Sequence, residues 1–379
     1  MMELTLTAWT PAEVYDRILR REPFFLLDVR NEDAFADWRI EGDGIEAMNV
    51  PYFDLLDGVD HLVPKLPRDK DILVVCAKEG SSKFVAEELV KAGLERVAYL
   101  QGGMRAWSEY LHPVKVGDVA GGALYQFLRV GKGCLSYAVV SNGEMAVVDP
   151  ARFTDVYLHF AKEKGTKIAA VIDTHLHADH ISGGRQLAEA AGATYYLPPG
   201  DAGEVTYAYE PLTDGEEIRI GQSRIAIRAL HSPGHTPGST SLIVDDKYLL
   251  SGDILFVGSI GRPDLAGRAK EFAPDLRRTL YETYRQLPGH LLVLPAHYAW
   301  ASEVNDEGVV SATLSELYAK NPGLQIQDEG EFVTTVTENL PPQPNAYQQI
   351  RMVNMGKLAP TPDEASEMEI GPNRCAVHG

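Results

Sequence analysis

Hydrophobic positions divide the chain into two parts with different texture. In the first hundred residues, three short runs are apolar throughout, each is bounded by charged or turn residues, and a helical pattern separates the last two. Such runs are typical of strands buried on both faces, and their alternation with helices predicts a parallel sheet. Thr10, Pro11 and Glu13 mark the start of an earlier helix as a capping box. The runs span 24–29, 72–75 and 97–100, and the helical pattern spans 83–92.

After residue 123 the pattern changes to short strands joined by tight turns. Asn142-Gly143 lies between two apolar segments and is a strong hairpin signal, and Asp245-Asp246 marks a second hairpin. Helical patterns separate the groups of strands. Many antiparallel strands with flanking helices predict two packed sheets covered by helices. The expected helices are 154–164, 182–191 and 272–287.

Changes in composition suggest the domain boundaries. We expect an α/β domain over 1–113, a Gly-rich linker over 114–122 and the metal-type domain described below over 123–340. The last segment, 341–379, contains several prolines that oppose long regular elements, and we expect it to pack as a loop-like tail on the second domain.

The charge excludes some classes of partner. Asp and Glu number 54 against 35 Lys and Arg, a formal charge of −19, which disfavours binding to nucleic acid or anionic lipid. No apolar run is long enough to span a membrane. We expect no signal peptide, because the N-terminal residues include Glu3 and have no basic start or long apolar stretch. Three widely spaced cysteines argue against a disulfide framework. We expect a cytoplasmic protein with reduced thiols, and a homodimer is compatible with the sequence.

The strongest chemical signal is the segment THLHADH, residues 174–180, directly after an apolar run. Three later residues are also of metal-ligand type. Asp253 and His297 each follow an apolar run, and His235 lies in a segment between apolar runs. Imidazole and carboxylate ligands suit zinc, iron and manganese, so the set predicts a metal site. The candidate ligands are His175, His177, Asp179, His180, His235, Asp253 and His297.

These motifs resemble the metallo-β-lactamase superfamily, which implies an αββα sandwich. The segments HADH, PGHTPG, SGD and GRPD are similar to the persulfide dioxygenase branch. The resemblance implies one Fe(II) held by His175, His235 and Asp253. The remaining four candidates, His177, Asp179, His180 and His297, then serve as a second site or surround the first.

The resemblance leaves three alternatives for function. The first is oxidation of a low-molecular-weight persulfide, such as glutathione persulfide, by O2 to sulfite, because two His and one carboxylate leave open positions on iron. The second is a zinc thioester hydrolase similar to glyoxalase II, with one or two metals and Asp253 bridging. The third is a non-enzymatic sulfide- or redox-sensing module, which the complete ligand set disfavours.

Two further residues of this domain are candidates for substrate binding. The resemblance implies that Arg262 contacts the carboxylate end of a glutathione-like thiol, while a structural ion pair with Asp264 is the alternative. Tyr298 directly follows His297, whereas the related enzymes have their thiol-contacting tyrosine one residue later. This departure puts glutathione itself in question as the thiol.

The first domain contains a cysteine loop. Cys76 ends an apolar strand and precedes a helix, and backbone N–H groups at such a position stabilise a thiolate. Together with LLDVR at 26–30 and LQGGMRAW at 100–107, the loop resembles a rhodanese domain. This implies that Cys76 is a nucleophile that carries sulfane sulfur between thiosulfate, sulfite and a thiol. We expect Lys78, which adds positive charge to the loop, and Ser81 to bind substrate. Cys134 is interpreted as a core residue and Cys375 as an inert surface thiol.

Overall fold

The computed structural model describes residues 6–221, 225–263, 268–338, 340, 343, 346–373 and 376–377. Asp264 and Cys375 lie outside these residues. The chain forms two compact units. The first contains Met1–His112, Arg129–Lys132 and Ile370–Pro372, and the second contains Pro113–Leu128, Gly133–Glu369 and Asn373–Gly379.

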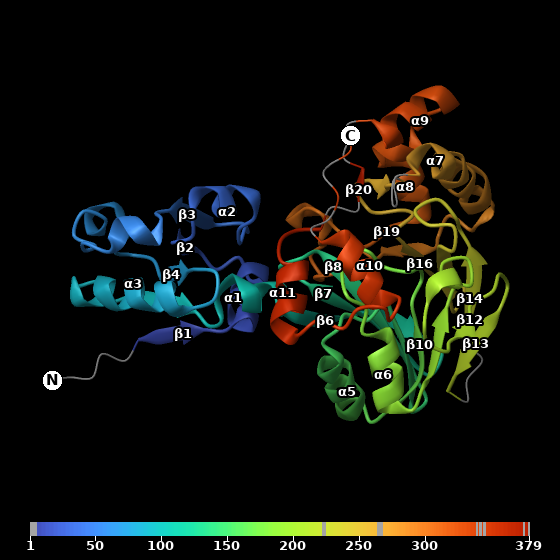
Figure 1. Cartoon of the computed structure of the whole chain (residues 1–379), viewed down its shortest axis with the longest axis horizontal. Coiled ribbons are helices and arrows are strands. Elements are labelled where there is room, and N and C mark those ends of the chain that lie inside the picture. The colour runs from blue at the N-terminus through green and yellow to red at the C-terminus, as the bar shows by residue number, and fades with distance from the viewer. Residues whose placement is uncertain are drawn as a thin grey trace. The chain divides into compact units, whose positions relative to one another are not determined.

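The first unit is built on a parallel sheet (Figure 1). Its strands are β1 (Thr7–Trp9), β2 (Phe24–Asp28), β3 (Ile45–Asn49), β4 (Ile72–Val75) and β5 (Val97–Leu100), and its helices are α1 (Pro11–Leu19), α2 (Glu32–Asp37), α3 (Gly80–Lys91) and α4 (Gly103–Glu109). The sheet order is β1-β5-β4-β2-β3, and every pairing is parallel. The three apolar runs form the central strands, and separate hydrophobic cores lie on the two faces, one against α1 and α4 and the other against α3. The predicted α/β architecture is confirmed.

The capping box predicted for the first helix is present. The Glu13 backbone N–H donates to Thr10 Oγ1, and the Glu13 carboxylate accepts from the Thr10 backbone N–H at 2.7 Å. Helix α3 begins at Gly80 rather than Lys83, because the chain turns sharply at Glu79, whose φ is 143°.

Thr10→Ala should lower the free energy of unfolding of the first unit by about 1 kcal/mol, since it leaves a backbone donor of α1 without its partner. Denaturant unfolding followed by tryptophan fluorescence measures this, because three of the four tryptophans, Trp9, Trp38 and Trp107, lie in the first unit. Thr313→Ala removes the same kind of capping box from the second unit and is the control. Equal shifts of this transition in both variants would contradict the prediction.

The second unit contains two sheets (Figure 1). The strands of the first are β6 (Leu111–Val119), β7 (Gly122–Arg129), β8 (Cys134–Ser141), β9 (Glu144–Val148), β10 (Lys167–Ile172), β11 (Thr194–Leu197) and β12 (Glu210–Pro211). Those of the second are β13 (Glu217–Ile220), β14 (Ile225–His231), β15 (Thr240–Val244), β16 (Tyr248–Gly252), β18 (Leu292–Pro295) and β19 (Ala312–Thr313). The strand orders are β12-β11-β10-β9-β8-β7-β6 and β13-β14-β15-β16-β18-β19. A short pair, β17 (Ile260–Gly261) and β20 (Ala376–Val377), is separate.

Helices cover the outer faces of both sheets. They are α5 (Thr154–Glu163), α6 (Gly184–Ala191), α7 (Ala269–Arg278), α8 (Leu314–Lys320) and α9 (Glu329–Thr337). Helices α5 and α6 pack on β10, and α7, α8 and α9 share a hydrophobic core with β15, β16 and β18. The predicted αββα sandwich is therefore confirmed.

Both predicted hairpins form. Strands β8 and β9 pair in antiparallel register around Asn142 and Gly143, and β15 and β16 pair around Asp245 and Asp246. All four turn residues have φ between 44° and 84°, the left-handed conformation that such two-residue turns require.

The structure differs from the sequence interpretation in three segments. Most of the expected linker 114–122 lies in β6, and of its glycines only Gly121 belongs to the turn before β7. The expected helix 272–287 changes at Thr279 into a π-helical and then a 3₁₀ segment. The proline-containing tail includes two helices, α10 (Tyr347–Asn354) and α11 (Pro362–Glu369). Pro362 takes the first position of α11, where a proline favours helix formation.

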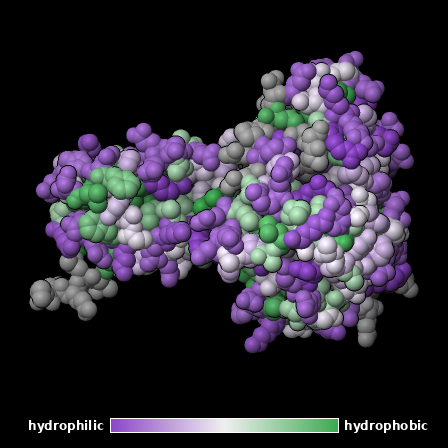
Figure 2. Space-filling model, in the orientation of Figure 1, coloured by the Kyte–Doolittle hydropathy of each residue, from purple (hydrophilic) through white to green (hydrophobic). Residues whose placement is uncertain are grey.

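The visible surface is mostly hydrophilic, and some hydrophobic side chains gather on the first unit (Figure 2). In that unit Phe53 and Leu56 are 71% and 52% exposed. Among the described residues, no helix has both the length and the apolar character needed to cross a membrane.

Candidate metal centre and cysteine loop

The candidate ligands of the second unit lie where strands of both sheets end. His175 follows β10 of the first sheet, while Asp253 and His297 follow the neighbouring strands β16 and β18 of the second sheet. His235 lies in the loop between β14 and β15. All four side chains are buried, with exposures of 1%. The sandwich thus brings residues more than a hundred positions apart into one interior region.

His175, His235 and Asp253 form the first cluster. The Asp253 Oδ2 atom lies 3.3 Å from His235 Nε2 and 3.8 Å from His175 Nε2. His175 Nε2 and both carboxylate oxygens of Asp253 are buried without a hydrogen-bond partner. Because buried polar atoms nearly always have a partner, a cation bound between these three residues fits the arrangement.

Hydrogen bonds on the far sides of the two imidazoles orient this cluster. His235 Nδ1 lies 2.8 Å from the Arg262 carbonyl and donates to it, which leaves Nε2 as the acceptor nitrogen. The Thr174 hydroxyl donates to Asp149 and therefore accepts from His175 Nδ1, 3.1 Å away. Both rings thus present an Nε2 lone pair to Asp253, as metal ligation requires.

The charges of this cluster also suit a cation. Burial, with the neighbouring His177, holds the pKa of His175 well below its usual value, so its imidazole is neutral. Burial would raise the pKa of Asp253, but the nearby His297 and His235 outweigh burial and hold this pKa below its usual range. A neutral imidazole and an ionised carboxylate are the forms that bind metals.

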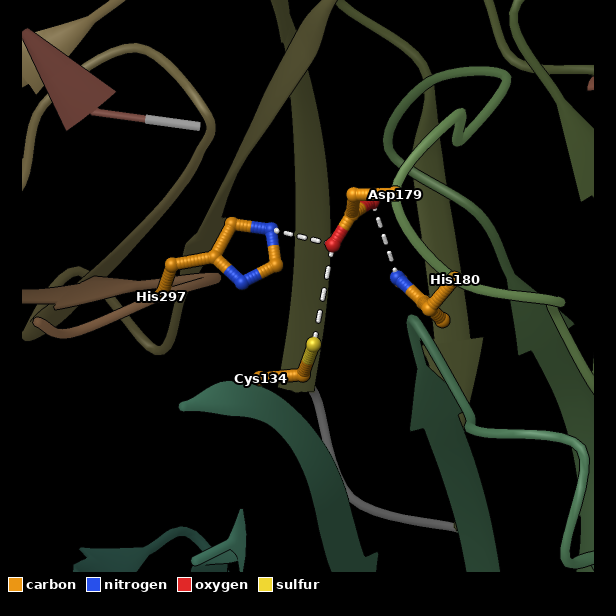
Figure 3. Close-up of side chains that lie close together, drawn as sticks. All are labelled: Cys134, Asp179, His180 and His297. Carbon is orange, nitrogen blue, oxygen red and sulfur yellow. Dashed lines mark hydrogen bonds and ion pairs between the residues drawn. The ribbon is translucent and has the colours of Figure 1, made fainter. Parts of the chain in front are cut away.

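A second cluster contains Cys134, Asp179, His180 and His297 (Figure 3). Asp179 Oδ2 lies 3.3 Å from His297 Nε2 and 3.6 Å from Cys134 Sγ, and Asp179 Oδ1 lies 3.1 Å from His180 Nδ1. His297 Nε2 also lies 3.1 Å from Asp253 Oδ1. The two oxygens of Asp253 therefore face different clusters.

Sequence reasoning missed Cys134 as a member of this cluster. The residue is buried as expected, but its thiol faces a carboxylate and two imidazoles instead of a hydrophobic core. Burial would raise the thiol pKa, yet the positive charge of His297 and contacts with His180 and His297 outweigh it and lower the pKa to about 7. The local sequence has no signal for this placement, since the partners come from other strands.

His177 belongs to a third group, with Asp149 and Asp173. Its Nε2 lies 3.1 Å from Asp149 Oδ1 and 3.9 Å from Asp173 Oδ1. Of the four residues expected to form or surround a second site, the structure brings together Asp179, His180 and His297. The His177 imidazole instead lies beside the carboxylates of Asp149 and Asp173.

Asp201 connects the two loops that carry His175 and His235. Its carboxylate accepts from the Leu176 backbone N–H at 3.0 Å, the Gly238 backbone N–H at 2.8 Å and the Thr236 hydroxyl at 2.7 Å. Leu176 adjoins His175 and Thr236 adjoins His235, so one side chain fixes the spacing of both ligand loops.

Residues near the C-terminus form hydrogen bonds with the loop that contains His177 and His180. Asn354 Nδ2 donates to the carbonyls of His177 and His180, both at 2.9 Å, and Asn354 Oδ1 accepts from the Ser182 backbone N–H. Glu369 accepts from the Ile181 backbone N–H at 2.8 Å and pairs with Arg152. Helices α10 and α11 thus supply contacts to the ligand loop that sequence reasoning did not anticipate.

The substrate-binding candidates of this unit lie close to the ligands in the chain. The Arg262 side chain is 1% exposed, and Tyr298 is half-buried with its backbone N–H donating to the Gly133 carbonyl. The alternative partner of Arg262, Asp264, lies outside the described residues. The roles of Arg262 and Tyr298 in substrate binding stay predictions.

In the first unit, Cys76 lies at the end of β4 and is 5% exposed. The Glu79 backbone N–H donates to Cys76 Sγ at 3.2 Å, and the thiol lies 3.2 Å from Ser82 Oγ. The neighbouring serine is therefore Ser82, while the predicted substrate contacts Lys78 and Ser81 are exposed and half-buried.

The motif LQGGMRAW packs against the base of this loop. The backbone N–H of Met104 donates to the Cys76 carbonyl at 2.8 Å, and a Cβ on Gly103 would lie 2.4 Å from that oxygen. Gly103 has a φ of 60°, so glycine meets both the steric and the conformational requirement. The Cys76 loop and the LQGGMRAW segment are therefore joined by a close backbone contact.

Comparison with known proteins identifies both units. The family model described as "Metallo-beta-lactamase superfamily" matches residues 129–299, and the chain is 31% identical over 208 residues to the mouse (Mus musculus) persulfide dioxygenase ETHE1, mitochondrial, covering 52% of this chain and 73% of that protein. The chain belongs to the metallo-beta-lactamase superfamily and is an enzyme of that class. The model "Rhodanese-like domain" matches residues 10–110, so this member joins a rhodanese-like domain to the metallo-beta-lactamase domain.

Other relatives include both functional classes expected from the sequence. A hydroxyacylglutathione hydrolase of Methylococcus capsulatus is 35% identical over 157 residues, covering 41% of this chain and 58% of the hydrolase. The crystal structure of ETHE1 from Myxococcus xanthus superposes with a TM-score of 0.54 at 25% identity and covers 62% of this chain and 99% of that one. Similarity alone therefore does not choose between oxygenase and hydrolase.

Asp201→Ala should weaken Fe²⁺ binding about 10- to 100-fold, because three hydrogen bonds that set the spacing of the His175 and His235 loops disappear. Anaerobic competition with a chromophoric chelator measures this affinity. Asp214 accepts one N–H bond from His231, so Asp214→Ala is a matched control that should keep wild-type affinity. Equal affinities in the Asp201 and Asp214 variants would show that Asp201 does not position the ligands.

Proposed function

We propose that the second unit oxidises a low-molecular-weight thiol persulfide, such as glutathione persulfide, with O2 at a single Fe(II). The overall reaction is RSSH + O2 + H2O giving RSH + H2SO3, in which sulfane sulfur is oxidised and O2 is reduced. The observation that supports it most is the His175, His235 and Asp253 cluster, with buried atoms that lack hydrogen-bond partners. The match to the persulfide dioxygenase is also longer than the match to the hydrolase, at 208 residues and 73% of that protein against 157 residues and 58%.

The residues of the chain have distinct tasks in this proposal. His175, His235 and Asp253 would hold the metal, and three protein ligands would leave it accessible to the persulfide and O2. When bound, Fe(II) supplies the redox chemistry with O2 that no side chain provides. The Arg262 carbonyl and the Thr174 hydroxyl keep the two imidazoles in the ligating tautomer.

Substrate binding is assigned to residues next to these ligands. The Arg262 guanidinium receives the carboxylate end of the thiol, for which its planar donor pair is suited. Tyr298, next to His297, contacts the thiol portion. The thiol can differ from glutathione, because Tyr298 stands one residue earlier than the thiol-contacting tyrosine of the related enzymes.

A zinc thioester hydrolase is the second candidate. The observation that favours it is the position of Asp253, whose two oxygens face the first cluster and His297. A carboxylate in that position could bridge two metals, and such a pair would activate a water molecule.

Full-length protein reconstituted anaerobically with Fe²⁺ should consume O2 when glutathione persulfide is added, and an oxygen electrode measures this. His235→Ala should reduce uptake to background, because it removes one of three ligands. His231→Ala changes a histidine four residues earlier, at the end of β14, which is exposed and bonded to the Pro237 carbonyl, and this variant should keep the uptake. Thioester hydrolysis by the zinc-loaded protein, without O2 uptake by the iron-loaded protein, would favour the hydrolase.

We propose that the first unit transfers sulfane sulfur through Cys76. The thiolate attacks the outer sulfur of thiosulfate, the bond between the two thiosulfate sulfurs breaks, and sulfite leaves with the electron pair. A thiol then attacks the outer sulfur of the Cys76 persulfide. The sulfur–sulfur bond breaks, and the Cys76 thiolate leaves. The Glu79 N–H directed at Sγ supports this role, since it stabilises the thiolate.

Cys76→Ser should abolish thiosulfate-to-thiol transfer, while iron-dependent O2 uptake stays within about twofold of wild type because the metal ligands lie in the other unit. Sulfite release and O2 uptake are measured on the same preparation. Cys375→Ser controls for general thiol loss and should keep both activities. Loss of both activities in Cys76→Ser would contradict independent sites.

A further inference from the structure

Glu79, in the loop between Cys76 and helix α3, has an unusual backbone conformation. Its φ is 143° and its ψ is −42°, whereas the other described non-glycine residues with positive φ lie between 44° and 54°. Those values are typical of the left-handed helical region, while a φ of 143° lies where glycine is strongly favoured. A residue keeps such a conformation only where its surroundings hold it, and strained residues cluster at functional sites. The contacts that hold Glu79 therefore bear on the Cys76 thiol.

Each polar group of Glu79 has a hydrogen-bond partner. The backbone N–H donates to Cys76 Sγ at 3.2 Å, and the carbonyl accepts from the Lys83 backbone N–H at 3.0 Å and the Ser82 hydroxyl at 2.9 Å. The carboxylate Oε2 accepts from the Gly102 backbone N–H at 2.7 Å. Any residue at this position could form the backbone bonds, whereas the bond to Gly102 requires an acceptor side chain of this length.

The carboxylate is anchored at the start of helix α4. Gly102 is the residue directly before this helix, and its φ is 70°. The next two free donors, the backbone N–H groups of Met104 and Arg105, donate to the carbonyls of Cys76 and the following residue at 2.8 and 3.0 Å. The first N–H groups of a helix have no partner within the helix, so the loop supplies the acceptors that they need. The Glu79 carboxylate is the one side chain among these acceptors.

The charge of this carboxylate alone would oppose the reaction at Cys76. A negative charge in the same loop disfavours a thiolate, because like charges repel. The group of Glu79 that favours the thiolate is its backbone N–H, which donates to Sγ. The carboxylate can therefore assist the thiolate only by holding the peptide that carries this N–H.

We propose that Glu79 is a positioning residue for the Cys76 nucleophile. Its carboxylate, bonded to the Gly102 N–H, holds the loop in the strained conformation that directs the Glu79 N–H at the sulfur. When the carboxylate is removed and a side chain remains, the backbone relaxes and the N–H turns away from Sγ. This inference rests on the proposed sulfur transfer through Cys76 and adds the residue that orients its hydrogen-bond donor.

Alkylation of Cys76 by iodoacetamide in the full-length protein near neutral pH tests the anchor. A Cys375→Ser background is used, and peptide mass spectrometry separates Cys76 from the buried Cys134. Glu79→Ala should slow alkylation at least about fivefold, since losing a hydrogen bond to an anion reduces the thiolate fraction more than the remaining thiolate gains in nucleophilicity. Glu88→Ala removes another glutamate of α3, which pairs with Lys91, and should keep the wild-type rate.

Two further variants separate the anchor from the charge and from a folding defect. Glu79→Gln keeps an acceptor oxygen without the charge and should react at least as fast as wild type. Glu79→Gly removes the anchor together with the strain, so its rate should return to within about twofold of wild type. Alkylation of Glu79→Ala at the wild-type rate, or slow alkylation of Glu79→Gln or Glu79→Gly, would overturn the proposal. The Gln and Gly variants decide the outcome even if Glu79→Ala does not fold.

Thiosulfate-to-thiol transfer by the same variants connects the anchor to the reaction. The transfer rate should fall in Glu79→Ala and recover in Glu79→Gln and Glu79→Gly, in the order of the alkylation rates. Transfer at the wild-type rate by a Glu79→Ala protein that alkylates slowly would overturn the role of Glu79 in sulfur transfer. Alkylation needs no sulfur donor, so absence of transfer in wild type would count against the proposed function of Cys76, while the alkylation series would still test the anchor.

Discussion

A buried carboxylate that receives no hydrogen bond determines the chemistry of the second unit. Asp253 is 1% exposed, and its two oxygens face three imidazoles, those of His175, His235 and His297. Desolvation of a charge is costly unless a cation or hydrogen-bond donors compensate for it. Against the effect of burial, His297 does most to lower the pKa of Asp253. His175 and His235 are oriented as lone-pair donors by other bonds. A metal ion is the partner that satisfies the carboxylate and the imidazoles together.

The sandwich makes this arrangement by ending strands of two sheets at one edge. The ligands lie in loops beyond the strand ends. Two side chains that are not ligands, Asp201 and Asn354, form hydrogen bonds with these loops. Asp201 joins the His175 and His235 loops, and Asn354 holds the carbonyls of His177 and His180. The ligand geometry therefore depends on segments that contribute no ligand, including a helix near the C-terminus.

Local signals in the sequence predicted most of the fold. Thr10 with Glu13, the Asn142-Gly143 turn and the all-apolar runs each fix their own element through contacts a few residues away. Runs of histidine and aspartate likewise indicated the ligand types. Asp201, Asn354 and Cys134 were not predicted, because each acts on groups between 25 and 177 residues away in sequence, and only the packing of the sheets shows the pairing. The tail differs from the expected loop because Pro362 stands at the first position of α11, where a proline favours a helix.

Cys76 and Cys134 are both buried, but different groups surround their thiols. Cys76 receives a backbone N–H and lies in the loop between β4 and α3, an environment that favours an anion. Cys134 faces a carboxylate and two imidazoles in the interior, where a thiolate without a cation would meet the negative charge of Asp179. The two thiols are therefore distinguished by their neighbours and not by their burial, since Cys76 stands in the loop before a helix and Cys134 stands among ionisable side chains.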